Sequence, residues 1–418
     1  MNGKRWSKRT GRVWAAVLLM LAAAPARAQL GGALPADPLG TAGRIGETVR
    51  DVTDGALASA GTAASAVRKL ASERLDRLAR YVSRNGEAVE WDDRHQPAVR
   101  GEVLLLDPDD TALERVRQAG YSVLEQGSLE GLGVSYARLR VPSGIPLARA
   151  LKDLRKALPG REITADQLHF PAGTAKSGER AQRPGGALPR GGTVGVIDGG
   201  IAGSDRLAAQ RGFARGAPRA SEHASAIASL LAGAGTAHIY GADVYGSDPA
   251  GGNALAIAKA LGWMQAQGVP VVSISLVGPG NPLLARAIAA ARSKNMVVVA
   301  AVGNDGAAAP PAYPASYPGV IAVTGVDGAG RVLIEAGRAT HLDYAAPGAD
   351  MSALVPGKGR VDLRGTSFAA PLAASRIAAR RLSTVSVAQA LEAVNSEAAG
   401  ASRKTGHGVV CGICRSGL

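Results

Sequence analysis

The chain contains little cysteine and few aromatic side chains. Of its 418 residues, two are cysteine and 4% are aromatic. So few cysteines exclude a small scaffold held by many disulfides, and so few aromatic rings leave little on which the bases of a single-stranded nucleic acid could stack. The excess of basic residues is spread along the chain and forms no block. We therefore expect no nucleic-acid partner.

Apolar runs long enough to cross a membrane are also missing beyond the first 28 residues. Five basic residues between Lys4 and Arg12 precede an apolar run from Val13 to Ala24, and Ala26-Arg27-Ala28 follow. This pattern is typical of a secretory signal cleaved before Gln29. The run is shorter than the roughly 20 residues of a span, although a retained anchor is the alternative.

Removal of residues 1–28 would reduce the formal charge from +14 to +8, because six basic residues leave with them. We expect a secreted or periplasmic protein that has no contact with a membrane after cleavage of the signal. A hydrophobic content of 46% supports a sizeable core in the rest of the chain.

The remaining chain divides into four segments. Residues 29–98 begin with a stretch rich in Gly, Ala and Pro, which we expect to be poorly ordered, and continue with a helical pattern from Thr62 to Arg84. In residues 99–170, strand and helix patterns alternate in the order βαββαβ, which is the ferredoxin-like split motif. Residues 171–191 have the Pro, Gly, Arg and Ser content of an exposed linker.

Residues 192–418 contain apolar strands that alternate with helical runs, for example "TVGVID", "VVSISLV" and "MVVVAAVG". Near-continuous apolar strands separated by helices predict a parallel sheet with helices on both faces. The predicted fold is therefore α/β, with a small βαββαβ domain before a larger parallel-sheet domain.

Four polar residues follow expected strands or begin expected helices: Asp198, His223, Asn304 and Ser367. In open parallel sheets, ligands bind at the carboxyl ends of the strands. Taken one by one, each residue has a plainer interpretation. Asp198 and Asn304 are common turn residues, a single histidine is usually structural, and Ser367 before an alanine-rich run is typical of a helix N-cap.

Taken together, the four residues indicate a catalytic site. An Asp, a His and a Ser, with an Asn amide from a further strand end, form a hydrolase triad with one oxyanion donor. The chain order Asp, His, Ser is that of subtilisin. No G-x-S-x-G is present, which argues against a lipase or esterase.

From about Gly192 to the C-terminus, the chain resembles the subtilisin-like serine proteases, or subtilases. The resemblance rests on seven motifs in the family's order: "VGVIDGGI", "EHASAIASLLAG", "SISLVGP", "AAVGNDG", "YPASYPGVIAV", "LDYAAPG" and "GTSFAAP". It implies a subtilisin-like fold and hydrolysis of peptide bonds, with protein or peptide substrates.

The resemblance also implies roles for individual residues. Ser367 would be the nucleophile, His223 the general base, Asp198 the carboxylate that orients the imidazole, and Asn304 the side-chain oxyanion donor. An extended substrate would pair with the strand that contains "SISLVG". The pocket for the residue before the scissile bond would have two walls, formed by Ser275, Leu276 and Val277 and by Ala301, Val302 and Gly303.

Three features depart from the family's pattern. In its H-G-T-H motif, the second histidine is Ala226 here and the Gly-Thr pair is Ala224-Ser225; Val277 stands where glycine is common. The first two departures affect packing around His223, and they leave room for a pseudoprotease that only binds peptides. Val277 adds bulk beside the pocket, so we expect a preference for small residues before the scissile bond.

Many subtilases carry a propeptide of the ferredoxin-like kind before the protease. By this resemblance, residues 99–170 would assist folding and lay their C-terminal segment along the cleft until the chain cuts itself within about Phe170 to Gly192. The alternatives are an independent binding module, or a regulatory binding protein in which this unit and the preceding helix are the working parts.

Cys411 and Cys414 are close together in a chain expected to be exported, which favours a local disulfide. A redox pair, or a zinc site with His407, is the alternative. We expect no catalytic cofactor and no catalytic metal. Calcium is common in subtilases, but no D-x-D-x-D-G loop is present, so structural calcium stays open.

Overall fold

The structure is a computed structural model that describes residues 65–66, 68–177, 191–381 and 385–418. The expected signal at 1–28, the stretch to about residue 60 and linker residues 178–190 lie outside the described residues. Among the residues that are described, no helix is both long and apolar enough to cross a membrane.

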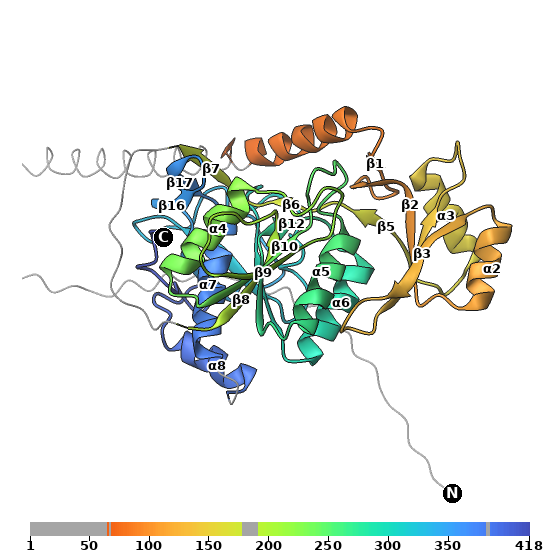
Figure 1. Ribbon diagram of the computed structural model, residues 1–418. Coiled ribbons are helices and arrows are strands. Elements are labelled where there is room, and N and C mark those ends of the chain that lie inside the picture. The colour runs from red at the N-terminus through yellow and green to blue at the C-terminus, as the bar shows by residue number, and fades with distance from the viewer. Residues whose placement is uncertain (1–64, 67, 178–190, 382–384) are drawn as a thin grey trace, which may run out of the picture. The chain divides into compact units, whose positions relative to one another are not determined.

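A seven-stranded parallel sheet forms the centre of the C-terminal half (Figure 1). The strand order is β15-β14-β13-β11-β8-β10-β9. Most of these strands are buried along their whole length, because both faces of the sheet are covered. In chain order the strands are β8 (Thr193–Asp198), β9 (Leu207–Gly212), β10 (His238–Asp243), β11 (Val271–Ile274), β13 (Val297–Ala301), β14 (Ile321–Val326) and β15 (Tyr344–Pro347).

Helices cover both faces of this sheet, which confirms the expected α/β fold. Helices α4 (Glu222–Gly233) and α7 (Thr366–Arg380) share one buried cluster with the sheet. Helices α5 (Ala254–Ala266) and α6 (Pro282–Ser293) share the cluster on the other face. The many alanines of α4 and α7 let these two helices lie close to the strands, and α8 (Val387–Asn395) packs on α7.

A second, antiparallel sheet precedes the parallel one. Strands β2, β3, β4 and β5 and helices α2 and α3 follow in the order βαββαβ, and the strand order is β5-β2-β4-β3, with β1 also paired to β2. The bounds are β1 (Val89–Trp91), β2 (Pro97–Leu106), α2 (Asp110–Gln118), β3 (Ser122–Ser128), β4 (Ser135–Arg140), α3 (Leu147–Ala157) and β5 (Ile163–Gln167). We refer to residues 97–167 as the βαββαβ unit.

The run "VLLL" in β2 has no polar alternation because both faces of this sheet are covered. Val103 and Leu105 belong to the cluster with α2 and α3. Leu104 and Leu106, which point to the opposite face, belong to the cluster with α5 and α6. The βαββαβ unit therefore packs its open sheet face on two helices of the parallel-sheet half.

Hydrogen bonds fix the position of β5 in this interface. The Asp166 carboxylate accepts from Leu255 N, in the first turn of α5, at 2.9 Å. The Asn281 side chain, which caps α6, donates to Ala165 O and to the side-chain oxygen of Gln167. The end of β5 is thus tied to the N-terminal ends of two helices.

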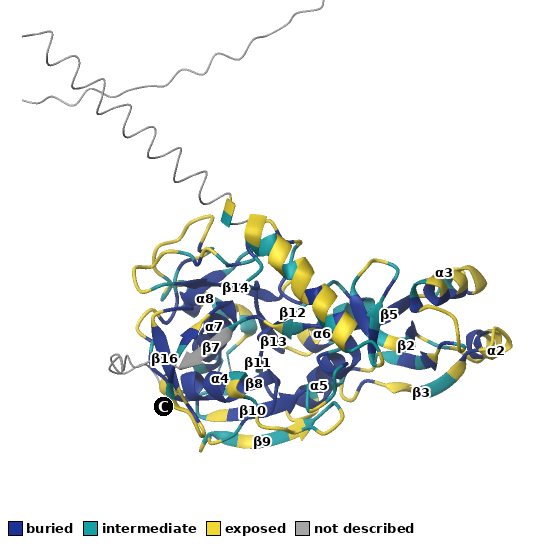
Figure 2. Ribbon diagram, turned by 90° about the horizontal axis from the view of Figure 1, so that it is seen from above, coloured by how far each residue is buried: buried dark blue, intermediate teal, exposed yellow. Residues whose placement is uncertain are grey.

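Short strands follow β5. Strand β6 (Phe170–Pro171) pairs with β12 (Leu276–Val277), and β7 (Thr174–Ser177) pairs with β17 (Gly359–Arg364), which also pairs with β16 (Met351–Val355). These pairings involve the first residues of the expected linker. A helix over residues 68–84, orange in Figure 1, is exposed along much of its length, whereas α7 is buried (Figure 2).

A buried ion pair joins α7 to the chain after α8. The Arg376 side chain is 2% exposed and makes two hydrogen bonds to the Glu397 carboxylate, which Arg380 also contacts. Burial raises the pKa of Glu397, but the hydrogen bonds from the two arginines outweigh burial and lower it. Glu397 therefore stabilises the fold in its ionised form.

We predict that Glu397→Ala lowers the free energy of unfolding at pH 7 by about 3 kcal/mol, because it leaves the buried Arg376 guanidinium without its partner. Since the pKa of Glu397 is lowered by folding, its contribution is present above the pKa of an unfolded Glu and is lost as the pH falls through the folded value. Urea denaturation at pH 7 and pH 4 measures both effects. The exposed Glu392→Ala is the control, and equal stability of the two variants at pH 7 would contradict the prediction.

Candidate active site

Asp198, His223 and Ser367 come together at the carboxyl edge of the parallel sheet. Asp198 is the last residue of β8, and His223 lies in the first turn of α4, whose N-cap is Ser221. His223 Nδ1 lies 3.0 and 2.9 Å from the two Asp198 carboxylate oxygens, and His223 Nε2 lies 2.9 Å from Ser367 Oγ. This is the hydrogen-bond chain of a nucleophile, its base and the group that orients the base.

The Asp198 carboxylate is buried, with 1% of its side chain exposed. Besides His223, it accepts a hydrogen bond from Gly199 N at 2.8 Å. A buried carboxylate that faces Nδ1 favours the tautomer with a proton on that nitrogen. Nε2 is then free to accept the proton of Ser367.

Ser367 is the second residue of α7, and the N-cap of α7 is Gly365. The N-cap interpretation of the serine is therefore wrong. Gly365 has a φ of 138°, which disfavours residues with a side chain, and a Cβ there would lie 2.5 Å from Asn304 Nδ2. The cap is a glycine because the chain turns into the helix directly beside the Asn304 amide.

The departures near His223 leave this geometry intact. Ala224 and Ala226 are fully buried against the core, and the Ser225 hydroxyl accepts from Ala202 N at 3.1 Å. Small side chains at these positions fill the space between α4 and the sheet. The His223 ring keeps hydrogen-bond contact with both of its partners.

A segment of the chain itself, residues 168–173, lies in the cleft beside Ser367; we call it the inserted segment. On one side, β6 pairs with β12, and Ala172 N donates to Ser275 O at 3.0 Å. On the other side, His169 N donates to Gly252 O at 2.8 Å. The inserted segment therefore forms a strand between two edges, as an extended peptide does in β-augmentation.

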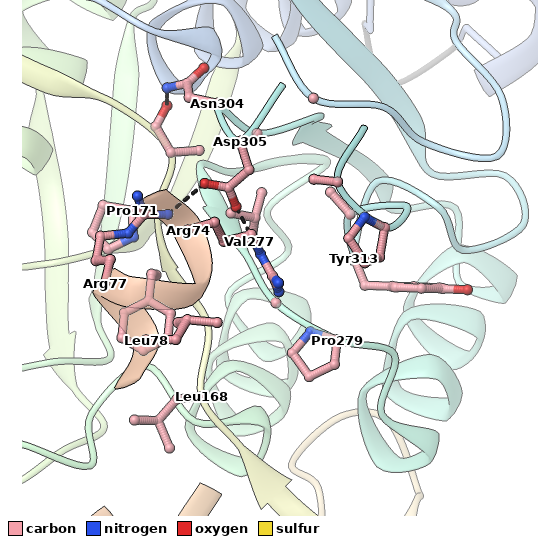
Figure 3. A pocket seen from close by; sticks show the side chains of 18 of the residues that line it. Arg74, Arg77, Leu78, Leu168, Pro171, Val277, Pro279, Asn304, Asp305 and Tyr313 are labelled. Carbon is pink, nitrogen blue, oxygen red and sulfur yellow. Dashed lines mark hydrogen bonds and ion pairs between the residues drawn. The ribbon is translucent and has the colours of Figure 1, made fainter. Parts of the chain in front are cut away.

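The carbonyl oxygen of Ala172 accepts two hydrogen bonds. The donors are Ser367 N, at 3.0 Å, and Asn304 Nδ2, at 2.5 Å; Figure 3 marks the second bond. Asn304 Oδ1 accepts from Thr366 N at 3.0 Å, which aims the amide at this oxygen. The two N–H groups have the arrangement of an oxyanion hole.

Gly173, the next residue, lies against the triad. A Cβ on Gly173 would lie 2.0 Å from Ser367 Oγ and 3.4 Å from His223 Nε2. A side chain therefore cannot occupy this position while the serine keeps its place. The Ala172–Gly173 peptide bond lies where a scissile bond would.

A cavity of about 900 Å³ adjoins the inserted segment. Val277, Val302 and Gly303 are among the residues that line it, and a Cβ on Gly303 would lie 3.3 Å from a methyl carbon of Val277. Leu276 pairs with Pro171 through its backbone. Ala301 is fully buried in β13 and is not among the lining residues.

His169 is buried where the inserted segment enters the cleft. Burial lowers its pKa to about 4, so the ring is neutral at pH 7. Its carbonyl accepts from the Tyr245 hydroxyl at 2.7 Å, and a Cβ on Gly278 would lie 2.6 Å from its ring. The glycine makes room for the imidazole.

The resemblance predicted that a C-terminal segment of the propeptide-like unit lies along the cleft, but no sequence signal identified residues 168–173 as that segment. Pro171, Ala172 and Gly173 have the composition of a linker, and their partners lie about 100 residues or more away along the chain. No local motif indicates such pairing. The signals were two expectations from the family resemblance, namely that the propeptide-like unit occupies the cleft and that self-cleavage falls within about Phe170 to Gly192.

Cys411 and Cys414 form a disulfide. Among the described residues, no group of three or more His, Cys, Asp or Glu side chains has the arrangement of a metal site.

Comparisons with known proteins match the C-terminal half of the chain to a family of proteases. A sequence model of the subtilase family, peptidase S8, matches residues 190–408. The alkaline protease of Shouchella clausii is 30% identical over 226 residues, which cover 50% of this chain and 59% of that protease. Subtilisin BL of Lederbergia lenta is 34% identical over 143 residues, which cover 34% of this chain and 52% of that protein.

The chain thus spans less than two thirds of the length of these relatives. A solved structure, fervidolysin of Fervidobacterium pennivorans, described as a keratinolytic enzyme related to subtilisin, has a TM-score of 0.63 and 18% identity over 76% of this chain and 61% of its own. That likeness is one of fold. Since the residues matched by the family model make up more than half of the chain and include Asp198, His223 and Ser367, the chain belongs to the subtilase family.

Proposed function

We propose that the chain is the precursor of a secreted or periplasmic serine endopeptidase that cleaves its own Ala172–Gly173 bond. The observation that carries this proposal is the position of the Ala172 carbonyl oxygen, between Ser367 N and Asn304 Nδ2. A peptide bond whose carbonyl oxygen accepts from both N–H groups, next to a serine paired with a histidine, has the position of the scissile bond of a bound substrate.

Each step of the reaction has a group in place. Ser367 Oγ attacks the Ala172 carbonyl carbon while its proton passes to His223 Nε2, and the negative oxygen keeps its two N–H donors. The imidazolium, stabilised by Asp198, then gives the proton to the Gly173 nitrogen as the C–N bond breaks. Water, deprotonated by His223, hydrolyses the Ala172 ester and restores Ser367.

The βαββαβ unit would act as the propeptide of this protease. Its support is the tie between β5 and the helices α5 and α6, which directs the following residues into the cleft. An independent binding module has no need to lay its C-terminal end along a catalytic groove. After cleavage, the same contacts would hold the unit on the protease as an inhibitor.

A pseudoprotease is the second candidate, suggested by the altered residues around His223. A binding protein has no need of the triad and the oxyanion donors together. The hydrogen-bond distances through His223 support catalysis instead. Export is supported by the sequence of residues 1–28, and mass analysis of the exported protein tests it together with self-cleavage.

We predict that the exported protein separates into two chains, one ending at Ala172 and one beginning at Gly173. Ser367→Ala removes the nucleophile and should give only the uncut chain. Intact-mass measurement of both proteins checks this outcome. Uncut protein in both cases, with no labelling of the parent by a serine-directed acylating probe, would favour the pseudoprotease.

We predict that Asn304→Ala slows self-cleavage by about a hundredfold or more, because one oxyanion donor is lost; in subtilisin this loss costs about 3 kcal/mol. The first-order rate of appearance of the Ala172 end is the measurement. Asn304→Asp is a matched variant, because it retains an oxygen that accepts from Thr366 N but has no donor. If Asn304→Asp cleaved at the parent's rate, Asn304 would have no oxyanion role.

We predict that the processed protease prefers small residues before the scissile bond, as Ala172 is. Val277→Gly should raise kcat/KM for a peptide with Phe at this position, relative to Ala, by about tenfold or more. Val277→Ala should give an intermediate ratio. Equal kcat/KM of the parent for both peptides would rule out Val277 as the residue that limits the pocket.

A further inference from the structure

The 68–84 helix contacts the cleft from outside the βαββαβ unit. Arg74, Arg77, Leu78 and Tyr81 line the cavity together with residues of the inserted segment and of the protease. Figure 3 shows the two arginines directed at Asp305. The helix therefore forms one side of the groove in which the inserted segment lies.

Asp305 is the residue after Asn304, and its charge is matched by the helix. Arg74 Nε lies 3.1 Å from Asp305 Oδ2, and Arg77 Nη2 lies 2.5 Å from Oδ1. The Asp305 side chain is 19% exposed and that of Arg74 is 18% exposed, so water screens this contact less than a surface pair. Among the described residues, both ion pairs of Asp305 come from this helix.

The next turn of the helix contacts the inserted segment itself. The Tyr81 ring packs edge-on against Phe170, with centroids 5.1 Å apart, and the Tyr81 hydroxyl donates to Pro249 O at 2.6 Å. Leu78 is buried. The 68–84 helix thus contacts both the inserted segment and the residues that surround the cleft.

Self-cleavage would divide the residues of these contacts between two chains. Asp305 and Pro249 would belong to the protease, whereas Arg74, Arg77, Tyr81 and Phe170 would belong to the N-terminal fragment. The ion pairs would then cross a boundary between two molecules. Partly buried charge pairs across such a boundary mainly slow dissociation.

We propose that Asp305 and its surroundings form an acidic docking site on the protease, and that the 68–84 helix is a second inhibitory segment held there by Arg74 and Arg77. This inference rests on the proposed self-cleavage. The partner that fits the site is a helix with two arginines three residues apart, so that both reach one carboxylate. In the precursor, that partner is residues 68–84 of the same chain.

Release of the protease from its N-terminal fragment tests the proposal. The full chain carries an affinity tag after residue 28, the self-cleaved complex is immobilised through the tag, and the rate at which the protease leaves is followed. Arg74→Ala/Arg77→Ala should release the protease about tenfold faster than the parent. Alanine favours helix, so the helix itself should persist.

Arg80→Ala/Arg84→Ala is the matched control, because it removes the same charge from exposed positions of the same helix. It should change the release rate less than about twofold. Asp305→Asn should speed release as much as the Arg74/Arg77 variant does, and the combination should add nothing further. Equal release by the two double variants, or additive effects of the Arg and Asp305 changes, would overturn the proposal.

Hydrogen exchange in the uncut Ser367→Ala precursor separates this inference from the proposed function. Amides of residues 68–84 should exchange about tenfold faster in Arg74→Ala/Arg77→Ala than in the control double variant. Equal exchange would overturn the docking site whether or not the parent cleaves itself. Faster exchange in a parent that never cuts would support the docking site and contradict the self-cleavage.

Discussion

Two N–H groups donate to one carbonyl oxygen, that of Ala172. The positions of the inserted segment and of the start of α7 depend on this contact. One donor belongs to the start of α7 and the other to the loop after β13. The inserted segment that carries this oxygen runs antiparallel to β12, and only a glycine fits at position 173. Glycine at 365 is required for the same reason, because α7 must begin beside the Asn304 amide.

The placement of the inserted segment depends on the interface between the antiparallel sheet and helices α5 and α6. Its centre is apolar, where Leu104 and Leu106 meet α5 and α6, and its edge carries ion pairs such as Lys259–Glu125. An apolar centre contributes most of the association free energy, whereas polar contacts fix the orientation. The hydrogen bond of Asp166 to the first turn of α5 is a contact of the second kind.

Sequence patterns predicted the features that local signals or the family's motifs carry, and they missed the long-range pairings that neither indicates. Asp198 and His223 could be placed at a strand end and a helix start from local signals, and their roles followed from the family's motifs in order. Cys411 and Cys414 are only three positions apart. The pairing of Phe170 with Val277 and the contact of Arg74 with Asp305 connect residues more than 100 positions apart. Pro, Ala and Gly at 171–173 are common in linkers, yet Gly173 lies against Ser367, where a Cβ would not fit. Ala301 could not be separated from Val302 by pattern, because both are buried apolar residues, one at the end of β13 and one directly after it.

The shortness of the connection between β5 and the Ala172–Gly173 bond has a further consequence. β5 ends at Gln167, so five residues join a docked sheet to the bond. While the chain is intact, the bond is present at the triad at a high effective concentration, independent of how much protein surrounds it. In the proposed cycle, one hydrolysis turns this intramolecular contact into an association of two molecules. After this cleavage, occupancy of the cleft depends on the concentration of the two fragments. Passage from a confined compartment into a large extracellular volume would dilute them, and this dilution would itself start proteolysis.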